Sequence, residues 1–179
     1  MMYHGLIIAG FGGQGIMLMG QILAEAGMLE GKHVTWLPSY GPEMRGGTAN
    51  CTVVISDEPV ASPVIDIPTE IIVMNIPSLL KFEPYLKTEG NLFMNTSVID
   101  REPKRKDIKI IKVPANDIAD KLGNLKVANM VMLGAYIATT KVVDKETVFE
   151  ALKRKLKGKK ENLLDINKRA ILEGMNLIS

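Results

Sequence analysis

The chain has 179 residues, of which 46% are hydrophobic and 23% charged, a balance typical of a globular domain and unlike that of a disordered or disulfide-stapled chain. One cysteine and two histidines exclude a four-thiolate cluster, a zinc site built from cysteine and histidine, and an intrachain disulfide. The net charge of +2 hides an asymmetry, because residues 1–100 hold 4 basic and 10 acidic side chains, whereas residues 101–179 hold 18 and 10.

The scarcity of charge in the first hundred residues has two explanations. Exposed positions normally collect charged side chains, so a surface this poor in charge is expected to be covered by another chain. Alternatively, the first hundred residues form most of a buried sheet. The two explanations are compatible. Both fit a single domain spanning residues 1–179, with a basic helical C-terminal part from about residue 141.

Three features bear on the compartment and on binding to membranes or nucleic acids. Residues 1–4 carry no basic region of the kind that opens a signal peptide, so we expect a cytoplasmic protein. The longest uncharged helical candidate, residues 129–140, is shorter than the ~20 apolar residues of a membrane span, so we expect no membrane segment. The basic run at residues 153–160 has no interleaved aromatic side chains, so we expect no nucleic-acid site. That run is either a solvated helix end or a docking surface for an acidic partner.

The predicted elements begin with a strand, a glycine turn and a helix. An apolar run at residues 5–10 predicts a strand that is buried on both faces. The helix expected at residues 16–29 has Glu25 as its only interior charge, so it should be buried on more than one side. Its small residues at positions 20, 24 and 27 allow a close approach to the sheet. That leaves Met17, Leu18, Ile22 and Met28 for a further contact, such as one with a partner subunit.

The remaining elements continue the alternation of strands and helices. Strands are expected at residues 33–37, 50–55, 71–74, 91–95 and 108–113, and helices at residues 79–82, 117–122, 129–140, 145–156 and 161–176. Ser78 is expected to cap the first of these helices. This order predicts an α/β fold, a three-layer α/β/α sandwich around a mainly parallel, Rossmann-like sheet.

The glycine turn is the first candidate binding site. Gly10, Gly12 and Gly15 fit the G-x-G-x-x-G spacing between a strand and a helix, with Gly13 and Gln14 inside the same turn. Such a turn lets a backbone approach phosphate, and the helix N-terminus attracts an anion. A dinucleotide site also needs an acidic residue near the end of the second strand, where residues 34–38 have none. The alternative is a turn required only for close packing of strand and helix.

The loop after the second strand is the second candidate site. It contains Tyr40, Glu43, Arg45, Gly46 and Gly47, and Arg45 is one of four basic residues in the first hundred. A guanidinium beside consecutive glycines combines a bidentate fork with backbone N–H donors, which suits phosphate or carboxylate. Glu43 can orient the arginine. Alternatively, the glutamate and the arginine only fix the shape of their own loop.

Cys51 and the two histidines are weaker candidates. Cys51 lies on an expected strand with no histidine near it in sequence, so a nucleophilic role would need a partner from elsewhere in the fold. His4 and His33 are placed as ordinary strand-end residues. We therefore expect neither a catalytic residue nor a metal site in this chain.

Several segments together resemble one family. They are Gly-Phe-Gly-Gly-Gln-Gly at residues 10–15, Ser-Tyr-Gly-Pro-Glu-Met-Arg-Gly-Gly-Thr-Ala-Asn at residues 39–50, and Ser-Asp-Glu-Pro at residues 56–59, followed by residues 129–135. In this order they resemble the gamma subunit of 2-oxoacid:acceptor (ferredoxin) oxidoreductases, the pyruvate/ketoisovalerate oxidoreductase gamma family. The likeness covers nearly the whole chain. Phe11 and residues 43–47 are most similar to the 2-oxoglutarate type.

The resemblance implies a multi-subunit oxidoreductase that converts 2-oxoglutarate to succinyl-CoA with release of CO2. Thiamine diphosphate, magnesium, iron–sulfur clusters and coenzyme A would serve the complex, and electrons would pass to ferredoxin or a similar acceptor. The implied partners are alpha and beta subunits, with a delta subunit left open. The isolated chain is expected to hold no cofactor and to be inactive.

Within such a complex the chain is expected to support assembly. The glycine turn and the Arg45 loop would either help to bind the nucleotide end of coenzyme A or face the catalytic subunits. Two other functions stay open at this stage: a stand-alone NAD(P)-binding Rossmann-type protein and a purely architectural subunit.

Overall fold

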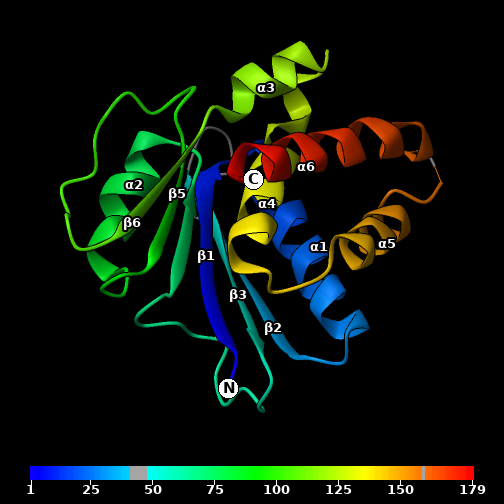
Figure 1. Cartoon of the computed structure of the whole chain (residues 1–179). Coiled ribbons are helices and arrows are strands. Elements are labelled where there is room, and N and C mark those ends of the chain that lie inside the picture. The colour runs from blue at the N-terminus through cyan, green and yellow to red at the C-terminus, as the bar shows by residue number, and fades with distance from the viewer. Residues whose placement is uncertain (41–47, 159) are drawn as a thin grey trace.

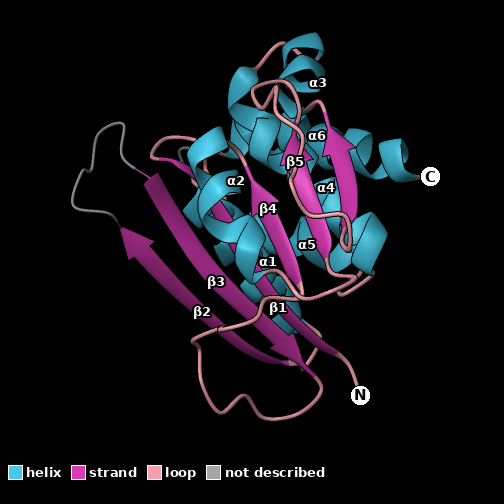
Figure 2. Cartoon of the chain, turned by 90° about the vertical axis from the view of Figure 1, so that its left-hand side faces the viewer, coloured by secondary structure: helices cyan, strands magenta, loops and turns pink. Residues whose placement is uncertain are grey.

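The computed structural model describes residues 1–40, 48–158 and 160–179. Its centre is a six-stranded sheet with the order β2-β3-β1-β4-β5-β6 (Figures 1 and 2). The strands are β1 (Tyr3–Phe11), β2 (His33–Tyr40), β3 (Thr48–Ser56), β4 (Glu70–Val73), β5 (Asn91–Asn95) and β6 (Lys109–Val113). β1, β4, β5 and β6 pair in parallel, and β3 is antiparallel to both of its neighbours, β1 and β2.

Helices cover both faces of the sheet (Figure 1). They are α1 (Ile16–Leu29), α2 (Ile76–Phe82), α3 (Ala115–Lys121), α4 (Ala128–Thr140), α5 (Lys145–Lys155) and α6 (Leu164–Ile178), with short 3-10 turns η1 (Glu83–Tyr85), η2 (Leu125–Val127) and η3 (Glu161–Leu163). α2 packs on one face and the other five helices lie on the opposite face, so each face has its own apolar core. The predicted three-layer α/β/α sandwich with a mainly parallel sheet is confirmed.

The first helix occupies a central place in the larger core. A Cβ atom added at Gly20 would lie 2.6 Å from Cys51 Sγ, and one added at Gly27 would lie 2.8 Å from Val34 Cγ2. The small residues therefore bring α1 close to β2 and β3, as predicted. Of the four side chains expected to make a further contact, Ile22 was misplaced, because it is fully buried and α1 also packs against α5 and α4 of the same chain. Met28 is 60% exposed, and a partner contact there stays a prediction.

The tightest contact between helices joins α4 and α6. A Cβ atom added at Gly134 would lie 2.0 Å from the carbonyl oxygen of Ile171, and one added at Gly174 would lie 1.9 Å from that of Val131. Each glycine therefore allows the backbone of the other helix to approach. This crossing fixes the C-terminal helix on α4, which itself packs on the sheet.

Two local predictions need correction. β2 continues through Pro38 to Tyr40, where a loop was expected. Proline has no backbone N–H to donate, but β2 is the outermost strand of the sheet, so no neighbour on its outer side needs that donor. α2 is capped by Asn75 rather than by Ser78. The side-chain Oδ1 of Asn75 accepts a hydrogen bond from the backbone N–H of Ser78 at 2.8 Å.

Among the described residues, no helix combines the length and the apolar character that a bilayer span requires.

Candidate functional site

The sheet has a topological switch point between β1 and β4. These strands pair in parallel, but the helix that follows β1 packs on one face of the sheet and the helix that follows β4 packs on the other. Chains that leave neighbouring parallel strands in opposite directions open a crevice at the carboxyl ends of those strands, the usual ligand site in open α/β sheets. The glycine turn at residues 12–15 lies at this point, between β1 and α1.

Gln14 holds the glycine turn in place. Its Oε1 accepts a hydrogen bond from the backbone N–H of Phe11 at 2.7 Å, and its Nε2 donates to the carbonyl oxygen of Met74 at 3.1 Å. Both ends of the amide are thus used within the chain, joining the turn to the end of β4. Gln14, predicted as a binding residue, has a positioning role in this structure.

The glycines of the turn differ in what surrounds them. A Cβ atom added at Gly10 would lie 2.6 Å from Gln14 Oε1, and one added at Gly15 would lie 2.2 Å from Asn129 Nδ2, so packing alone explains both. Gly13 has a positive φ of 91°, yet a Cβ atom there would meet nothing within 4 Å. Gly12 and Gly13 are exposed. The tip of the turn therefore presents open backbone.

A hollow of about 170 Å³ lies against this tip. Its lining residues are Gly13, Gln14, Met74, Asn116, Leu125, Lys126, Ala128 and Asn129. The volume is smaller than the ~300–1,000 Å³ of most small-molecule pockets, so the hollow suits one end of a ligand, such as a phosphate group. It brings together the end of β4, the N-terminal parts of α3 and α4, and the η2 turn.

Three polar side chains line the hollow beside the turn. Asn129 Nδ2 donates to the carbonyl oxygen of Gly15 at 3.2 Å and its Oδ1 accepts from the N–H of Met130 at 2.9 Å, so this amide is engaged. Asn116 Oδ1 accepts from Asn95 Nδ2 at 2.9 Å, which leaves its own Nδ2 group as a donor. Lys126 is exposed and makes no ion pair within the described part of the chain.

The electrostatics of the hollow favour an anion. α1 begins at Gly15, which has no side chain to cap the helix, and its first turn contains no acidic residue. The uncapped N–H groups and the positive end of the helix dipole therefore face the turn without a compensating carboxylate. The ammonium group of Lys126 adds a full positive charge.

The second predicted site is described only at its borders. Tyr40 is 61% exposed. It pairs with Ala49 of β3, and Ala49 pairs with Gly10 of β1. Tyr40 therefore lies two strands away from the glycine turn, at the same end of the strands. Thr48 pairs with Phe11. The other predicted residues of this loop, Glu43, Arg45, Gly46 and Gly47, lie outside the described residues.

Cys51 is a buried structural thiol. Its Sγ donates to the carbonyl oxygen of Ile16 at 3.7 Å, and burial raises its pKa to about 12, with a smaller opposing contribution from Trp36. A thiol that keeps its proton at neutral pH is neither a good nucleophile nor a metal ligand. Among the described residues, no group of three or more His, Cys, Asp or Glu side chains could hold a metal ion.

The histidines lie away from the hollow. His4 Nδ1 lies 3.0 Å from Glu70 Oε1 near the amino ends of β1 and β4, at the edge opposite the glycine turn. His33 is exposed at the start of β2. Both are strand-end residues, as expected.

The order of the strands differs from that of a dinucleotide-binding Rossmann sheet. In the Rossmann arrangement the second strand lies directly beside the first, and its end carries the acid that holds the ribose. Here β3 lies between β1 and β2. The end of β2 carries no acid among residues 34–38 and does not adjoin the glycine turn.

Comparison with known proteins gives a consistent set of similarities. A sequence model described as pyruvate ferredoxin/flavodoxin oxidoreductase matches residues 5–177. The ketoisovalerate oxidoreductase subunit VorA of Methanothermobacter marburgensis is 40% identical over 93% of the chain, and the match spans 35% of VorA. The 2-oxoglutarate synthase subunit KorC of the same organism is 39% identical over 82% of both chains.

The fold is similar to that of a solved structure. The keto/oxoacid ferredoxin oxidoreductase gamma subunit from Geobacter sulfurreducens superposes with a TM-score of 0.84 at 28% identity, over 98% of each chain. The chain spans only about a third of the length of the VorA relative.

Proposed function

Because the chain belongs to the pyruvate ferredoxin/flavodoxin oxidoreductase family, we propose that it acts as a gamma-type subunit of a 2-oxoacid:ferredoxin oxidoreductase. Its relatives are subunits of such oxidoreductases. Alpha and beta subunits, with or without a delta subunit, would complete the enzyme, and ferredoxin or a similar protein would accept the electrons. The proposed reaction is oxidation of 2-oxoglutarate to succinyl-CoA with release of CO2. The relative KorC, named as a 2-oxoglutarate synthase subunit, supports that substrate.

The redox cofactors are assigned to the partner subunits. The sequence offers one thiol, Cys51, and burial holds its pKa far above neutrality, so this chain cannot ligate an iron–sulfur cluster through thiolates. We propose that thiamine diphosphate and magnesium are likewise held by the partner subunits, as the resemblance to the family implies. Thiamine diphosphate, when bound there, supplies the carbanion chemistry of decarboxylation.

The chain itself would hold one anionic end of coenzyme A. The observation that carries this proposal is the hollow at the switch point, where open backbone at Gly13 meets the uncapped start of α1 and the ammonium group of Lys126. A phosphate group fits the donors that face it, and Asn116 Nδ2 adds one more. Arg45, Glu43, Gly46, Gly47 and Tyr40 are proposed to extend the same site.

The test is co-expression of the chain with its alpha and beta partners. The assembled enzyme should reduce its acceptor with a higher kcat/KM for 2-oxoglutarate than for ketoisovalerate or pyruvate. A preference for ketoisovalerate would reject the substrate assignment while retaining the subunit role. If the chain remains a monomer and forms no complex with either partner, the subunit role itself is rejected.

A purely architectural role is the second candidate, because Gly10, Gln14 and Gly15 are all explained by packing within the chain. Changing Arg45 to Ala in the assembled enzyme separates the two. An unchanged KM for coenzyme A would favour architecture, whereas a raised KM with unchanged kcat would favour binding.

A further inference from the structure

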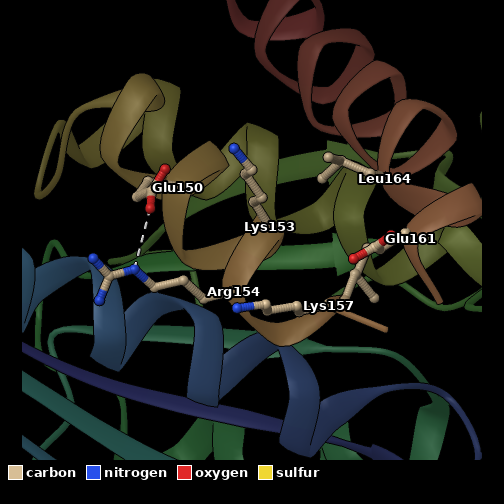
Figure 3. A pocket seen from close by; sticks show the side chains of 7 residues that line it. Glu150, Lys153, Arg154, Lys157, Glu161 and Leu164 are labelled. Atoms are coloured by element: carbon tan, nitrogen blue, oxygen red, sulfur yellow. Dashed lines mark hydrogen bonds and ion pairs between the residues drawn. The ribbon is translucent and has the colours of Figure 1, made fainter. Parts of the chain in front are cut away.

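A second hollow lies where the end of α5 meets the start of α6 (Figure 3). Its volume is about 580 Å³. The lining residues are Glu150, Lys153, Arg154, Leu156, Lys157, Glu161 and Leu164. None of them lines the hollow at the glycine turn, so this groove is a separate feature of the surface, and we call it the α5–α6 groove.

The two carboxylates in the α5–α6 groove already have partners. Glu150 Oε1 accepts from Arg154 Nε at 3.2 Å, the contact drawn in Figure 3, and Arg154 Nη1 also lies 3.9 Å from Glu25 Oε1 on α1. Glu161 Oε1 accepts from the backbone N–H of Gly158 at 3.1 Å. The arginine and both acids are thus held by contacts within the chain, and together they carry a net charge of −1.

The two lysines of the groove make its net charge positive, because its seven lining residues include three basic and two acidic side chains. Lys153 and Lys157 are exposed and lie four residues apart around the end of α5, and neither makes an ion pair with a described carboxylate. Residues 153–160 hold six basic and no acidic side chains. Lys153 lies in the last turn of α5, and Lys157 lies two residues beyond the end of this helix. The groove therefore offers two separated ammonium groups rather than one focused anion site.

Two leucines also line the groove. Leu156 is 4% exposed and belongs to the main core, and Leu164 at the start of α6 is half-buried against the same core. A compact anion such as phosphate would gain nothing from this apolar floor and would face Glu150 and Glu161. A polypeptide segment that spaces carboxylates around an apolar side chain would match the floor and both lysines at once.

We infer that the α5–α6 groove docks an acidic, amphipathic polypeptide segment of a partner chain. Charge complementarity carries the argument, since residues 153–160 are strongly basic and the two groove lysines make no ion pair with a described carboxylate. The relative VorA adds support for a polypeptide occupant. The match spans 35% of VorA, so in that protein a domain of this kind is joined to a much longer polypeptide.

The probe for this inference is a fluorescent peptide of about 14 residues, with Glu at helical i, i+4 spacing on either side of a leucine stripe. Fluorescence anisotropy with the full chain measures its Kd at about 0.05 M and 0.3 M salt. We expect saturable binding that weakens at the higher salt, because exposed charge pairs are screened. The double variant Lys153→Glu/Lys157→Glu should raise the Kd at least about tenfold and should instead bind a peptide with Lys at the Glu positions.

The matched control is Lys104→Glu/Lys106→Glu, which makes the same charge change at two exposed lysines far from the groove in sequence. It should leave the Kd within about twofold. Equal weakening by the control would show that only net charge matters and would overturn the inference. So would displacement of the peptide by equimolar inorganic pyrophosphate, which would assign the groove to a compact anion. Circular dichroism of each variant checks that the fold is intact.

Discussion

The side-chain amide of Asn129 donates a hydrogen bond to the backbone carbonyl of Gly15 at 3.2 Å, joining α4 to a turn that lies 114 residues earlier in the chain. Gly15 has a φ of 74°, and the space where its Cβ would lie is filled by this amide. The contact holds the glycine turn against the core and leaves the tip at Gly13 open.

Replacing Gly15 with Ala should destabilise the chain more than the same change at Gly13. Both residues have a positive φ, which costs a non-glycine residue ~1–2 kcal/mol. At Gly15 the methyl group would also lie 2.2 Å from Asn129 Nδ2, whereas at Gly13 it meets nothing within 4 Å. We expect Gly15→Ala to lower the Tm more than Gly13→Ala, by roughly 2–4 °C for each ~1 kcal/mol of added steric cost, measured by calorimetry. Equal Tm values would contradict the described packing.

Lys126 should contribute to coenzyme A binding in the assembled enzyme. Removing its ammonium group with Lys126→Ala should raise the KM for coenzyme A about tenfold, or ~1.4 kcal/mol, with little change in kcat. Lys121→Ala, at an exposed lysine on α3 outside the hollow, is the matched control and should leave the KM unchanged. If both variants behave alike, the hollow is not the phosphate site.

The crossing of α4 and α6 should tolerate no side chain at either glycine. Gly134→Ala and Gly174→Ala each place a methyl group within 2.0 Å of a backbone carbonyl oxygen of the facing helix. The helices must then separate, at a cost of at least ~3 kcal/mol in the free energy of unfolding. Gly31→Ala, where φ is 74° but the space for a methyl group is open, should cost only ~1 kcal/mol. Urea unfolding of the three variants measures the difference.

Cys51 should resist alkylation in the folded chain. Burial raises its pKa from 9.0 to about 12, so iodoacetamide at pH 8 should label it only after unfolding in urea. The same shift predicts that stability falls as the pH rises from 9 toward 12, because the unfolded thiol loses its proton in this range and the folded thiol keeps it. The slope should be steeper than that of Cys51→Ala by up to ~1.4 kcal/mol per pH unit. Parallel slopes for the two proteins would contradict the assignment.

Local patterns were sufficient to predict most of the secondary structure. The apolar run before the glycine turn and the helix at residues 16–29 were confirmed because both follow periodicities that depend on nearby residues. The extension of β2 to Tyr40 was missed because it depends on pairing with β3, which makes Pro38 tolerable on an edge. Ile22 was misplaced because nothing in a single helix shows that α5 will cover its far side.

The candidate site was only half predictable. Glycine spacing indicated the turn, but the contact of Gln14 with Met74 could not be predicted, because it depends on a residue 60 positions away in the sequence. Nothing in the sequence marked Lys126 or Asn116 as site residues. Lys126 lies in the short η2 turn and Asn116 near the start of α3, and neither position follows a periodic pattern. Asn129 belonged to a segment that resembled the family, yet its hydrogen bond to Gly15 required the fold to be known.

The central claim is that this chain is a subunit without a redox centre whose presence completes a 2-oxoacid oxidoreductase. The most direct measurement is 2-oxoglutarate- and coenzyme A-dependent reduction of a viologen dye by purified alpha and beta subunits, by this chain alone, and by the three combined. The account predicts turnover by the combined sample, none by the isolated chain, and a rise in the KM for coenzyme A when the chain is omitted. Turnover by the isolated chain with a bound prosthetic group, or full activity of the partners with an unaltered KM in its absence, would contradict it.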